Sequence, residues 1–440
     1  MKPNGLLIAV ALLALLAGGI WYSNKKQAGS PAKSATDTTT KLLTLTDDQF
    51  QDLRIKKAAG EGEYLKRDNG KWALVEPKPL PADQDAVAGM TTALSTLTAD
   101  KTIEQNATDL APYGLANPAL DITFTKKDGK TVEVLLGDAT PTNSGFYAKM
   151  AGDPHIYTLA SFVKTNLDKT ANDLRDKRLL TFDSDKLTRL LLTAKGPSIE
   201  FGKNGQNEWQ ILKPQPYRAD SSLVEALINK LRDAKMDPAV TDEDARKAAA
   251  AFASGAKVST VVVSDNSGDQ TLELHKDKDK NYYAKSTVVA GVFKVPGDIG
   301  DATDKGLDDF RNKKLFDFGF SDPSKVDLKG VTYTKSGDKW MSGAKTMDNT
   351  SVQNLVDKLR DLAATRFADK GAGDPVFEAT VTSNGGKRVE KVTIRKQGAQ
   401  YFAQREGEAG IYELEAKSVD DLIKAASDVK EAVPEPVKKK

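Results

Sequence analysis

Three cations recur with one spacing in this sequence, and they are the residues best suited to contact a charged partner. Arg175, Lys177 and Arg178 are followed 136 residues later by Arg311, Lys313 and Lys314. A basic cluster of this kind could dock onto an acidic protein or onto anionic lipid headgroups. Cations in the last turn of a helix also stabilise its dipole and cap its free carbonyls, so a structural role is the alternative.

A second candidate is an aromatic side chain that recurs in three short strands. These strands read FYAK, YYAK and YFAQ and begin at residues 146, 282 and 401. Their tyrosines could line a ligand pocket between repeated parts of the chain, and the candidates are Tyr147, Tyr283 and Tyr401. Because a packed core also needs alternating aromatics, core packing is the favoured interpretation of these strands.

The chain offers little for catalysis or for metal binding. It has no cysteine and only two histidines, His155 and His275, which excludes thiolate zinc sites, thiol catalysis and His-rich metal sites. Asp265–Asp269 places oxygen ligands at alternate positions but lacks the glutamate that a calcium loop requires. No phosphate-binding P-loop motif occurs, and no GxGxxG follows a strand. We therefore predict no catalytic residue, no cofactor and no metal.

The composition indicates a globular protein that does not bind nucleic acid. The chain has 440 residues, 39% of them hydrophobic and 29% charged, which is enough apolar material for packed cores. At about 150 residues per domain, this length predicts roughly three domains. The net charge of +2 provides no basic excess to neutralise a phosphate backbone.

The sequence contains three copies of one internal repeat, and each copy has a tryptophan at the same place: Trp72, Trp209 or Trp340. Phe50–Val87 aligns without gaps onto Leu187–Val224, whereas the third copy is shortened before its tryptophan. The second half of each copy reads as antiparallel strands, with Asp128-Gly129 and Gly385-Gly386 at hairpin tips.

Each copy also contains an amphipathic helix that follows an aspartate. Counted from Asp83, Asp220 and Asp348, apolar residues recur at positions +4, +7 and +11, which predicts one buried stripe and an N-cap. A pair of catalytic carboxylates is the alternative role for these aspartates. Because each aspartate lies in a separate copy, the capping role is favoured.

A closing helix is predicted at the end of each copy, over Leu167–Asp183, Gly306–Gly319 and Val419–Ala432. The first two contain the recurrent cations, and the third has Lys424-Ala425-Ala426 in their place. The copies therefore predict an α+β fold of three tandem related modules of antiparallel sheet with helices. The predicted modules are residues 42–180, 181–317 and 318–433, followed by a polar tail at 434–440.

The N-terminal segment predicts a membrane location. Leu6–Tyr22 is a run of 17 residues without a charge, which is close to the lower limit for a membrane-spanning helix. We predict residues 1–22 to be a transmembrane anchor or a cleaved signal segment, with the anchor favoured. Residues 23–41 are polar and predict a flexible linker. The body would then lie on the periplasmic side of the inner membrane, tethered by a single pass.

A family resemblance follows from a series of short motifs. Tyr113–Pro118 (YGLANP), Leu135–Asp138 (LLGD), Gly145–Lys149 (GFYAK) and Leu174–Asp183 (LRDKRLLTFD) resemble the bacterial family known as domain of unknown function 4340. The resemblance implies a membrane-tethered, extracytoplasmic accessory protein, of a kind often encoded beside ABC-type transport systems. It implies no catalytic residues.

We therefore predict a non-catalytic binding or assembly protein whose partners are the membrane and ABC transporter subunits or other envelope proteins. A second hypothesis is a small-molecule or glycan binder. A third is a carboxylate-based hydrolase of envelope polymers, which would need two carboxylates in one cleft.

Overall fold

The computed structural model describes residues 39–60, 62–237, 242–319 and 323–433. The chain divides into two compact units, one ending at Asp176 and the other beginning at Lys177. The predicted anchor 1–22, most of the predicted linker 23–41 and the tail 434–440 lie outside the described residues. Within the described ranges, no helix is long and apolar enough to cross a membrane.

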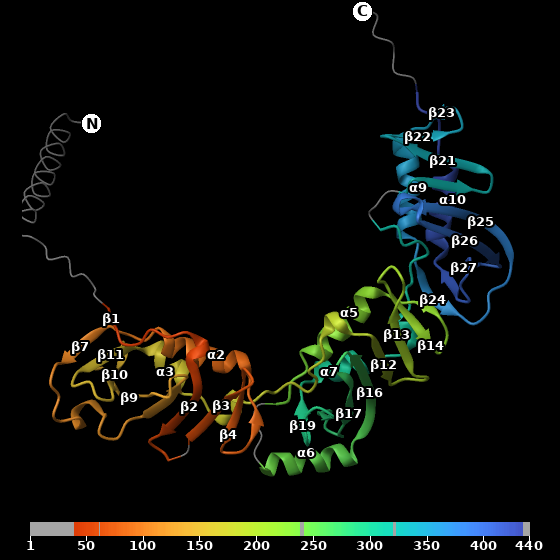
Figure 1. The fold of residues 1–440 in the computed structure, drawn as a ribbon. Helices are drawn as coiled ribbons and strands as arrows, with labels where there is room; N and C mark the ends of the chain where they lie inside the picture. The colour runs from red at the N-terminus through yellow and green to blue at the C-terminus, as the bar shows by residue number, and fades with distance from the viewer. Residues whose placement is uncertain (1–38, 61, 238–241, 320–322, 434–440) are drawn as a thin grey trace, which may run out of the picture. The chain divides into compact units, whose positions relative to one another are not determined.

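The first unit is built on a large antiparallel sheet (Figure 1). Its described strands run in the order β5-β4-β3-β2-β8-β9-β10-β11-β7, and β1 pairs separately with β6. The strands are β1 (Thr40–Lys41), β2 (Phe50–Lys57), β3 (Gly62–Asp68), β4 (Lys71–Glu76), β5 (Leu80–Pro81), β6 (Thr98–Ala99), β7 (Lys101–Glu104), β8 (Leu120–Lys126), β9 (Thr131–Ala139), β10 (Gly145–Met150) and β11 (Ile156–Ala160). The helices are α2 (Gln84–Ser95), α3 (Ser161–Leu167) and α4 (Ala171–Leu174), with 3-10 turns η1 (Asp47–Gln49) and η2 (Ala111–Tyr113).

The second unit contains two further sheets of the same kind. The first has the order β15-β14-β13-β12-β16-β17-β18-β19. Its elements are η3 (Ser184–Lys186), β12 (Arg189–Thr193), β13 (Ile199–Lys203), β14 (Trp209–Lys213), β15 (Tyr217–Arg218), α5 (Ser221–Arg232), α6 (Asp242–Ser254), β16 (Ala256–Asp265), β17 (Gly268–Lys276), β18 (Tyr282–Ser286), β19 (Val292–Val295), α7 (Gly297–Thr303) and α8 (Leu307–Phe310).

The last sheet has the order β23-β22-β21-β20-β25-β26-β27-β28-β24. Its elements are β20 (Lys325–Leu328), β21 (Val331–Ser336), β22 (Lys339–Ser342), β23 (Lys345–Thr346), α9 (Asn349–Asp361), β24 (Ala364–Ala368), β25 (Asp374–Ser383), η4 (Asn384–Gly386), β26 (Arg388–Gln397), β27 (Gln400–Arg405), β28 (Ile411–Leu414) and α10 (Ala416–Ser427). The three strand orders correspond position by position except at one edge. The predicted α+β fold with repeated antiparallel-sheet modules is therefore confirmed.

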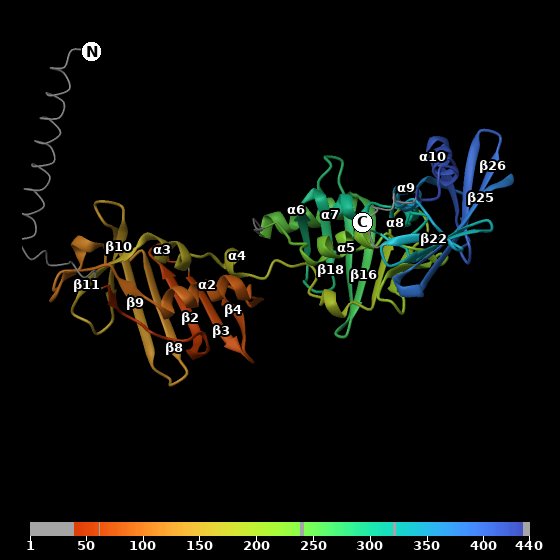
Figure 2. The same ribbon diagram turned by 90° about the horizontal axis from the view of Figure 1, so that it is seen from above.

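Each sheet has its own hydrophobic core, formed by one face of the sheet and the helices that cover it (Figures 1 and 2). Along β2, the buried residues Phe50, Leu53 and Ile55 are separated by more exposed ones, as expected for a strand with one packed face. The tryptophan of each copy, Trp72, Trp209 or Trp340, is buried in the core of its own sheet.

The predicted helix caps are confirmed in all three copies. The side chain of Asp83 accepts hydrogen bonds from the backbone amides of Asp85 and Ala86 at 3.0 and 3.1 Å. Asp220 and Asp348 begin α5 and α9 in the same way. Each cap of this type contributes about 1 kcal/mol to stability. The hairpin tips are also as predicted, because Gly129, Gly385 and Gly386 have positive φ angles.

The predicted closing helices are wrong in the first two copies. The helix at 167–183 is replaced by α4, which ends at Leu174, and by an extended segment after it. The amide of Asp176 donates to the carbonyl of Pro81 at 2.8 Å, so the chain makes sheet-like rather than helical hydrogen bonds here. The physical reason is that Leu179, Leu180 and Phe182 are buried in the core of the next sheet, which a continuing helix could not reach.

An extended segment of this kind leads the chain into each of the three cores, and we call these the entry segments. They cover residues 40–45, 177–182 and 313–318 and supply Leu42, Leu43 and Leu45 to the first core, then their counterparts to the second and third. The predicted module limits at 180/181 and 317/318 fall inside them. In the third copy, the predicted helix at 419–432 corresponds to α10, which begins earlier and ends at Ser427.

The sheets differ at the edge beyond β11, β19 and β28. Strands β7 and β24 extend the first and third sheets there, whereas no described strand pairs with this side of β19. The corresponding part of the middle copy contains α6, which packs against β17, β18 and β19. Phe252 of α6 stacks on His275 of β17 with ring centroids 3.8 Å apart. His275 therefore lies beneath a helix.

Candidate functional site

The entry segments place some of the predicted cations at equivalent, exposed positions. Arg178 lies opposite Lys235 in an isolated bridge, and Lys314 lies opposite Ala363. In the first unit, Lys41 is opposite Thr98 in the same arrangement. The cations therefore belong to a strand that pairs with the segment after the first long helix of each copy. The alternative role in a last helical turn does not hold for these exposed cations, although Arg175 and Arg311 are the C-cap residues of the short helices α4 and α8.

Arg175 and Arg311 lie before the entry segments and are buried, each only 8% exposed. The guanidinium of Arg311 lies 4.1 Å from the ring centre of Tyr217 and 3.5 Å from that of Phe367, so it joins the second and third sheets. Burial lowers the pKa of Arg175. These two arginines are therefore enclosed by their own chain and are not exposed for a partner.

The third copy does carry a residue at the position of these arginines. Glu431 forms a bridge with Met347, just as Arg175 does with Ala82 and Arg311 with Ala219. The predicted replacement, Lys424-Ala425-Ala426, lies instead within α10. A charge of opposite sign therefore ends the last copy, and Glu431 pairs with Lys345.

A cleft of about 530 Å³ lies between the second and third sheets, at the entry segment of the third. Its walls come from β14, from the start of α5, from residues 312–317 and from Arg388 at the start of β26. Lys313 and Lys314 line it, and Trp209 contributes an aromatic wall. The structure thus brings two of the predicted partner-binding residues into one concavity, together with residues that the sequence did not single out.

Arg218 is the central residue of this junction, with a side chain only 12% exposed. Its guanidinium is hydrogen-bonded to Asp317 and to the carbonyl of Lys314, and it donates to Glu408 at 2.8 Å. Burial alone would lower the pKa of Arg218, but Asp317, Tyr412 and Glu408 raise it. The arginine therefore stays charged and joins the two sheets electrostatically.

A second layer of ion pairs supports Arg218. Arg405 donates to Glu408 at 2.8 Å and to Glu390 at 3.1 Å, and Glu390 also accepts the backbone amide of Asp317. Burial raises the pKa of Glu390, although Arg405 opposes this shift. Burial also raises the pKa of Tyr412 to about 12, so its hydroxyl remains a donor to Glu408 at 2.7 Å.

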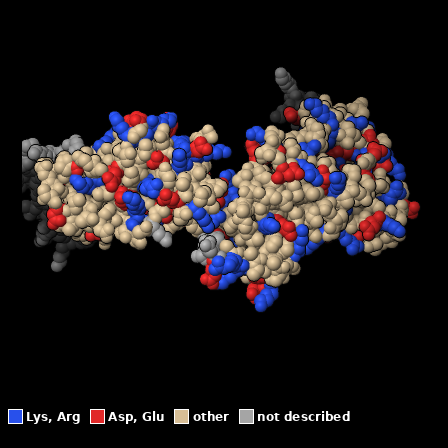
Figure 3. All heavy atoms as spheres, turned by 60° about the horizontal axis from the view of Figure 1, so that its bottom comes forward, with Lys and Arg blue, Asp and Glu red and all other residues tan. Residues whose placement is uncertain are grey.

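The charges that remain available in the cleft are those of Lys313 and Lys314. The other charged groups of the cleft are satisfied internally, because Arg388 pairs with Glu208, Arg218 with Asp317, and Asp220 caps α5. Lys313 and Lys314 are exposed and form no ion pair among the residues described. On the face shown in Figure 3, acidic and basic residues are otherwise interspersed in both units. The cleft can therefore accept an anionic group.

The three predicted pocket tyrosines are not brought together. Tyr401 is 4% exposed in the core of the third sheet, and its hydroxyl donates to Asp420 at 2.9 Å. Tyr147 packs edge-on against Tyr113 within the first unit, with ring centroids 5.0 Å apart. The register explains the error: Phe402, not Tyr401, holds the position in the third sheet that Tyr147 and Tyr283 hold in the first two. Tyr401 holds the neighbouring position, which faces the core.

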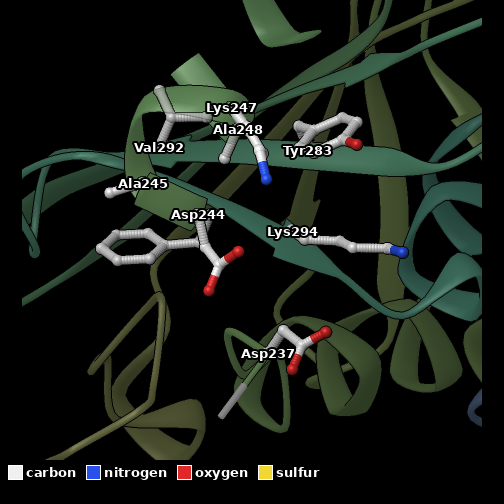
Figure 4. A pocket seen from close by; sticks show the side chains of 9 residues that line it. Asp237, Asp244, Ala245, Lys247, Ala248, Tyr283, Val292 and Lys294 are labelled. Carbon is white, nitrogen blue, oxygen red and sulfur yellow. The ribbon is translucent and has the colours of Figure 1, made fainter. Parts of the chain in front are cut away.

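Tyr283 does line a pocket, on the middle sheet beneath α6 (Figure 4). Ala245 and Ala248 of α6 form one wall, and Val292 and Lys294 of β19 form another. The pocket has a volume of about 250 Å³. It is smaller than the 300–1,000 Å³ usual for ligand sites. The hydroxyl of Tyr283 already donates to Asp277 at 3.2 Å. The charged residues Asp237, Asp244, Lys247 and Lys294 line the pocket beside its apolar walls.

The remaining candidate groups are engaged within the chain. Asp265 accepts the amides of Ser267 and Asp183 at 2.8 and 2.7 Å, as a turn and loop anchor would. Among the described residues, no group of three or more His, Cys, Asp or Glu could hold a metal ion. In the first unit, Asp153 accepts hydrogen bonds from His155 and, at 2.7 Å, from the hydroxyl of Tyr157.

The Asp153 cluster leads to a testable pH dependence. Partial burial would raise the pKa of Asp153, but hydrogen bonds from His155 and Tyr157 outweigh it and lower the pKa to about 2, from 3.8. A lowered carboxyl pKa stabilises the fold above the unfolded pKa, and this contribution is lost as pH falls through about 2. Melting temperatures of the native chain and of Asp153→Asn should therefore differ at neutral pH and converge near pH 2. A difference that is constant with pH, or one equal to that of exposed Asp68→Asn, would contradict this role.

The fold and the cleft define a class of protein: repeated antiparallel-sheet modules, the last two joined through a charged junction with a concavity beside it. The chain belongs to the family described as a domain of unknown function (DUF4340), which matches residues 72–210 and 209–380. The two matches begin at Trp72 and Trp209, the equivalent tryptophans of the first two copies. No curated protein and no solved structure matches the chain.

Proposed function

We propose that this chain is a non-catalytic, membrane-anchored binding and assembly protein on the extracytoplasmic side of the inner membrane. In this role it is an accessory component of an ABC-type transport system, as the family resemblance implies. The proposal is supported above all by the exposed ammonium groups of Lys313 and Lys314 in a cleft whose other charges are satisfied. An acidic segment of an envelope protein is the partner that this arrangement fits.

The chemistry of the cleft favours binding over hydrolysis. A carboxylate pair for glycoside hydrolysis needs one protonated acid and one free carboxylate. In the cleft, Asp317 and Glu208 are each paired with an arginine, Arg218 and Arg388 respectively. Both carboxylate groups are thus held in ion pairs within the chain, so neither is free to act on a substrate. The small pocket beside Tyr283 is the observation that supports the alternative, a small-molecule binder.

The proposal predicts that the two lysines carry the contact with the partner. Cells producing the full chain would be treated with a carbodiimide, which joins lysine amines to carboxylates in direct contact. We expect a crosslinked envelope protein whose linkage maps to Lys313 or Lys314. Lys313→Glu/Lys314→Glu removes the two coupling amines, so the readout is the total yield of this protein crosslinked through any lysine of the chain. That yield should fall at least about tenfold, because reversing two contacting charges costs more than about 1.4 kcal/mol.

The matched control is Lys278→Glu/Lys285→Glu, which makes the same charge change at exposed positions away from the cleft. This control should leave the crosslinked yield unchanged, and both variants should melt like the native chain. Equal yields from the native chain and from the Lys313/Lys314 variant would refute the proposed surface. So would recovery of the chain without any partner.

A further inference from the structure

An apolar groove in the first unit is not explained by the junction cleft. It lies between α2 and α3 and has a volume of about 390 Å³. Ala88, Gly89, Thr92 and Ala93 form its α2 wall, and Phe162 rises from α3 on the other side. None of the described residues that line it is charged. The ring of Phe162 is 63% exposed, an unusual position for so large an apolar side chain.

The repeats show that this groove is a departure from the common design. The counterpart groove between α5 and α7 is crossed by an ion pair, Lys230 to Asp298 at 2.8 Å. In the third copy, Lys358 of α9 lies 3.6 Å from Asp421 of α10. The first copy has Ala93 and Phe162 where the second has Lys230 and Asp298. In the first copy, an apolar surface thus takes the place of the ion pair that joins the two helices in the other copies.

The groove also lies where the described chain enters the first unit. Leu97 and Thr98 line it, and the carbonyl of Leu97 accepts the amides of Leu42 and Leu43 at 2.8 and 3.2 Å. Only 19 residues, 23–41, separate Leu42 from the apolar run that ends at Tyr22. A chain of 19 residues would span roughly 24 Å on average if it behaves as the linker that the sequence predicts. A lipid bilayer that held residues 6–22 would therefore lie within reach of the groove.

Two exposed cations lie on the strands beside this entry point. Lys41 of β1 is opposite Thr98, and Lys101 begins β7 two residues after β6. Both are exposed. Asp100, which precedes Lys101, is exposed as well. Exposed lysines and an exposed aromatic in one unit are features that favour contact with anionic headgroups and with the apolar layer below them.

We propose that this groove docks the first unit onto the lipid bilayer, with Phe162 entering the boundary between headgroups and acyl chains. Lys41 and Lys101 lie against anionic headgroups, and fluid acyl chains fill the concave surface between α2 and α3. This inference rests on the proposed anchor, because the anchor holds the bilayer permanently within reach of the groove. The grooves of the second and third copies are not suited to the same role, because an ion pair spans each of them.

The absence of cysteine in the sequence gives a direct test. Phe162→Cys in the full chain would carry one environment-sensitive fluorophore, and the chain would be reconstituted into vesicles of phosphatidylcholine and phosphatidylglycerol. Lipids carrying a doxyl quencher just below the headgroup should quench this label at least twofold. The matched control is Asp298→Cys, at the equivalent position in the second copy, which should not be quenched.

A second set of variants tests the groove without replacing Phe162 by the label. A fluorophore at Thr92→Cys should also be quenched, and adding Ala93→Lys/Phe162→Asp, which restores the ion pair of the second copy, should abolish that quenching. If the chain floats with the vesicles but labels at 162 and 298 are quenched equally, the groove inference fails while the anchor stands. A shift in emission that needs no lipid would indicate a protein occupant and overturn the inference. Failure to float would refute the anchor itself.

Discussion

Replacing Arg218 by methionine is expected to destabilise the second unit by about 3 kcal/mol, because it leaves Asp317 and Glu408 at the junction without their shared cation. Both carboxylates are largely shielded from water, with side chains 20% and 17% exposed. With a typical dependence on denaturant, this loss lowers the urea midpoint by about 1–2 M. Pulse proteolysis across a urea series would measure the shift, with fragments assigned by mass spectrometry.

The matched control for this substitution is Arg232→Met. Arg232 lies in the same copy and pairs with its exposed neighbour Asp233 at 3.0 Å. Its loss should change stability by no more than about 0.5 kcal/mol. If Arg218→Met shifts the midpoint as little as the control does, Arg218 does not hold the second and third sheets together. A loss of stability confined to the first unit would equally contradict the proposed role of Arg218 at the junction.

The junction around Arg218 could not have been predicted from the sequence. Its ion pairs join residues 99 and 190 positions apart, so no local spacing connects them. The repeat does not reveal the junction either, because the first copy has Pro81 at the position of Arg218. Charged contacts between modules depend on how two folded surfaces meet, and that information is absent from the periodicity of either module.

The elements set by local chemistry were predictable. Asp83, Asp220 and Asp348 cap their helices because a short acidic side chain before an amphipathic stripe satisfies free amides wherever the rest of the chain goes. The hairpin tips follow from glycines at positive φ angles. Alternation predicted the aromatic strands, but a one-residue offset in the third copy assigned Tyr401 to the wrong face.

The entry segments were missed although the sequence contains a signal for them. Lys41–Leu45 reads KLLTL, and Arg178–Phe182 reads RLLTF at the same shift of 137 that relates the two tryptophans. Extending the repeat alignment back by nine residues would have shown that the cations begin a copy. Helical periodicity in LRDKRLL obscured this, because two adjacent leucines fit one face of a helix as well as a buried strand.

Two phenylalanines six residues apart test whether the entry segment belongs to the following copy. Phe310 and Phe316 are each 1% exposed, yet Phe310 lies in the core of the second sheet and Phe316 in that of the third. Removing either ring creates a cavity that costs about 3–5 kcal/mol. Phe310→Ala should accelerate amide hydrogen exchange in β12–β19, and Phe316→Ala should do so in β20–β28.

The two variants serve as controls for each other, because they remove the same ring from equally buried positions on one short segment. Phe310 also packs against Phe201 of β13, with ring centroids 5.1 Å apart, so its loss reports directly on the second sheet. If both variants open the same sheet, the entry segment belongs to the copy before it. If either variant opens both sheets equally, the Arg218 junction fuses the two cores into one cooperative body, and the copies do not unfold as separate units.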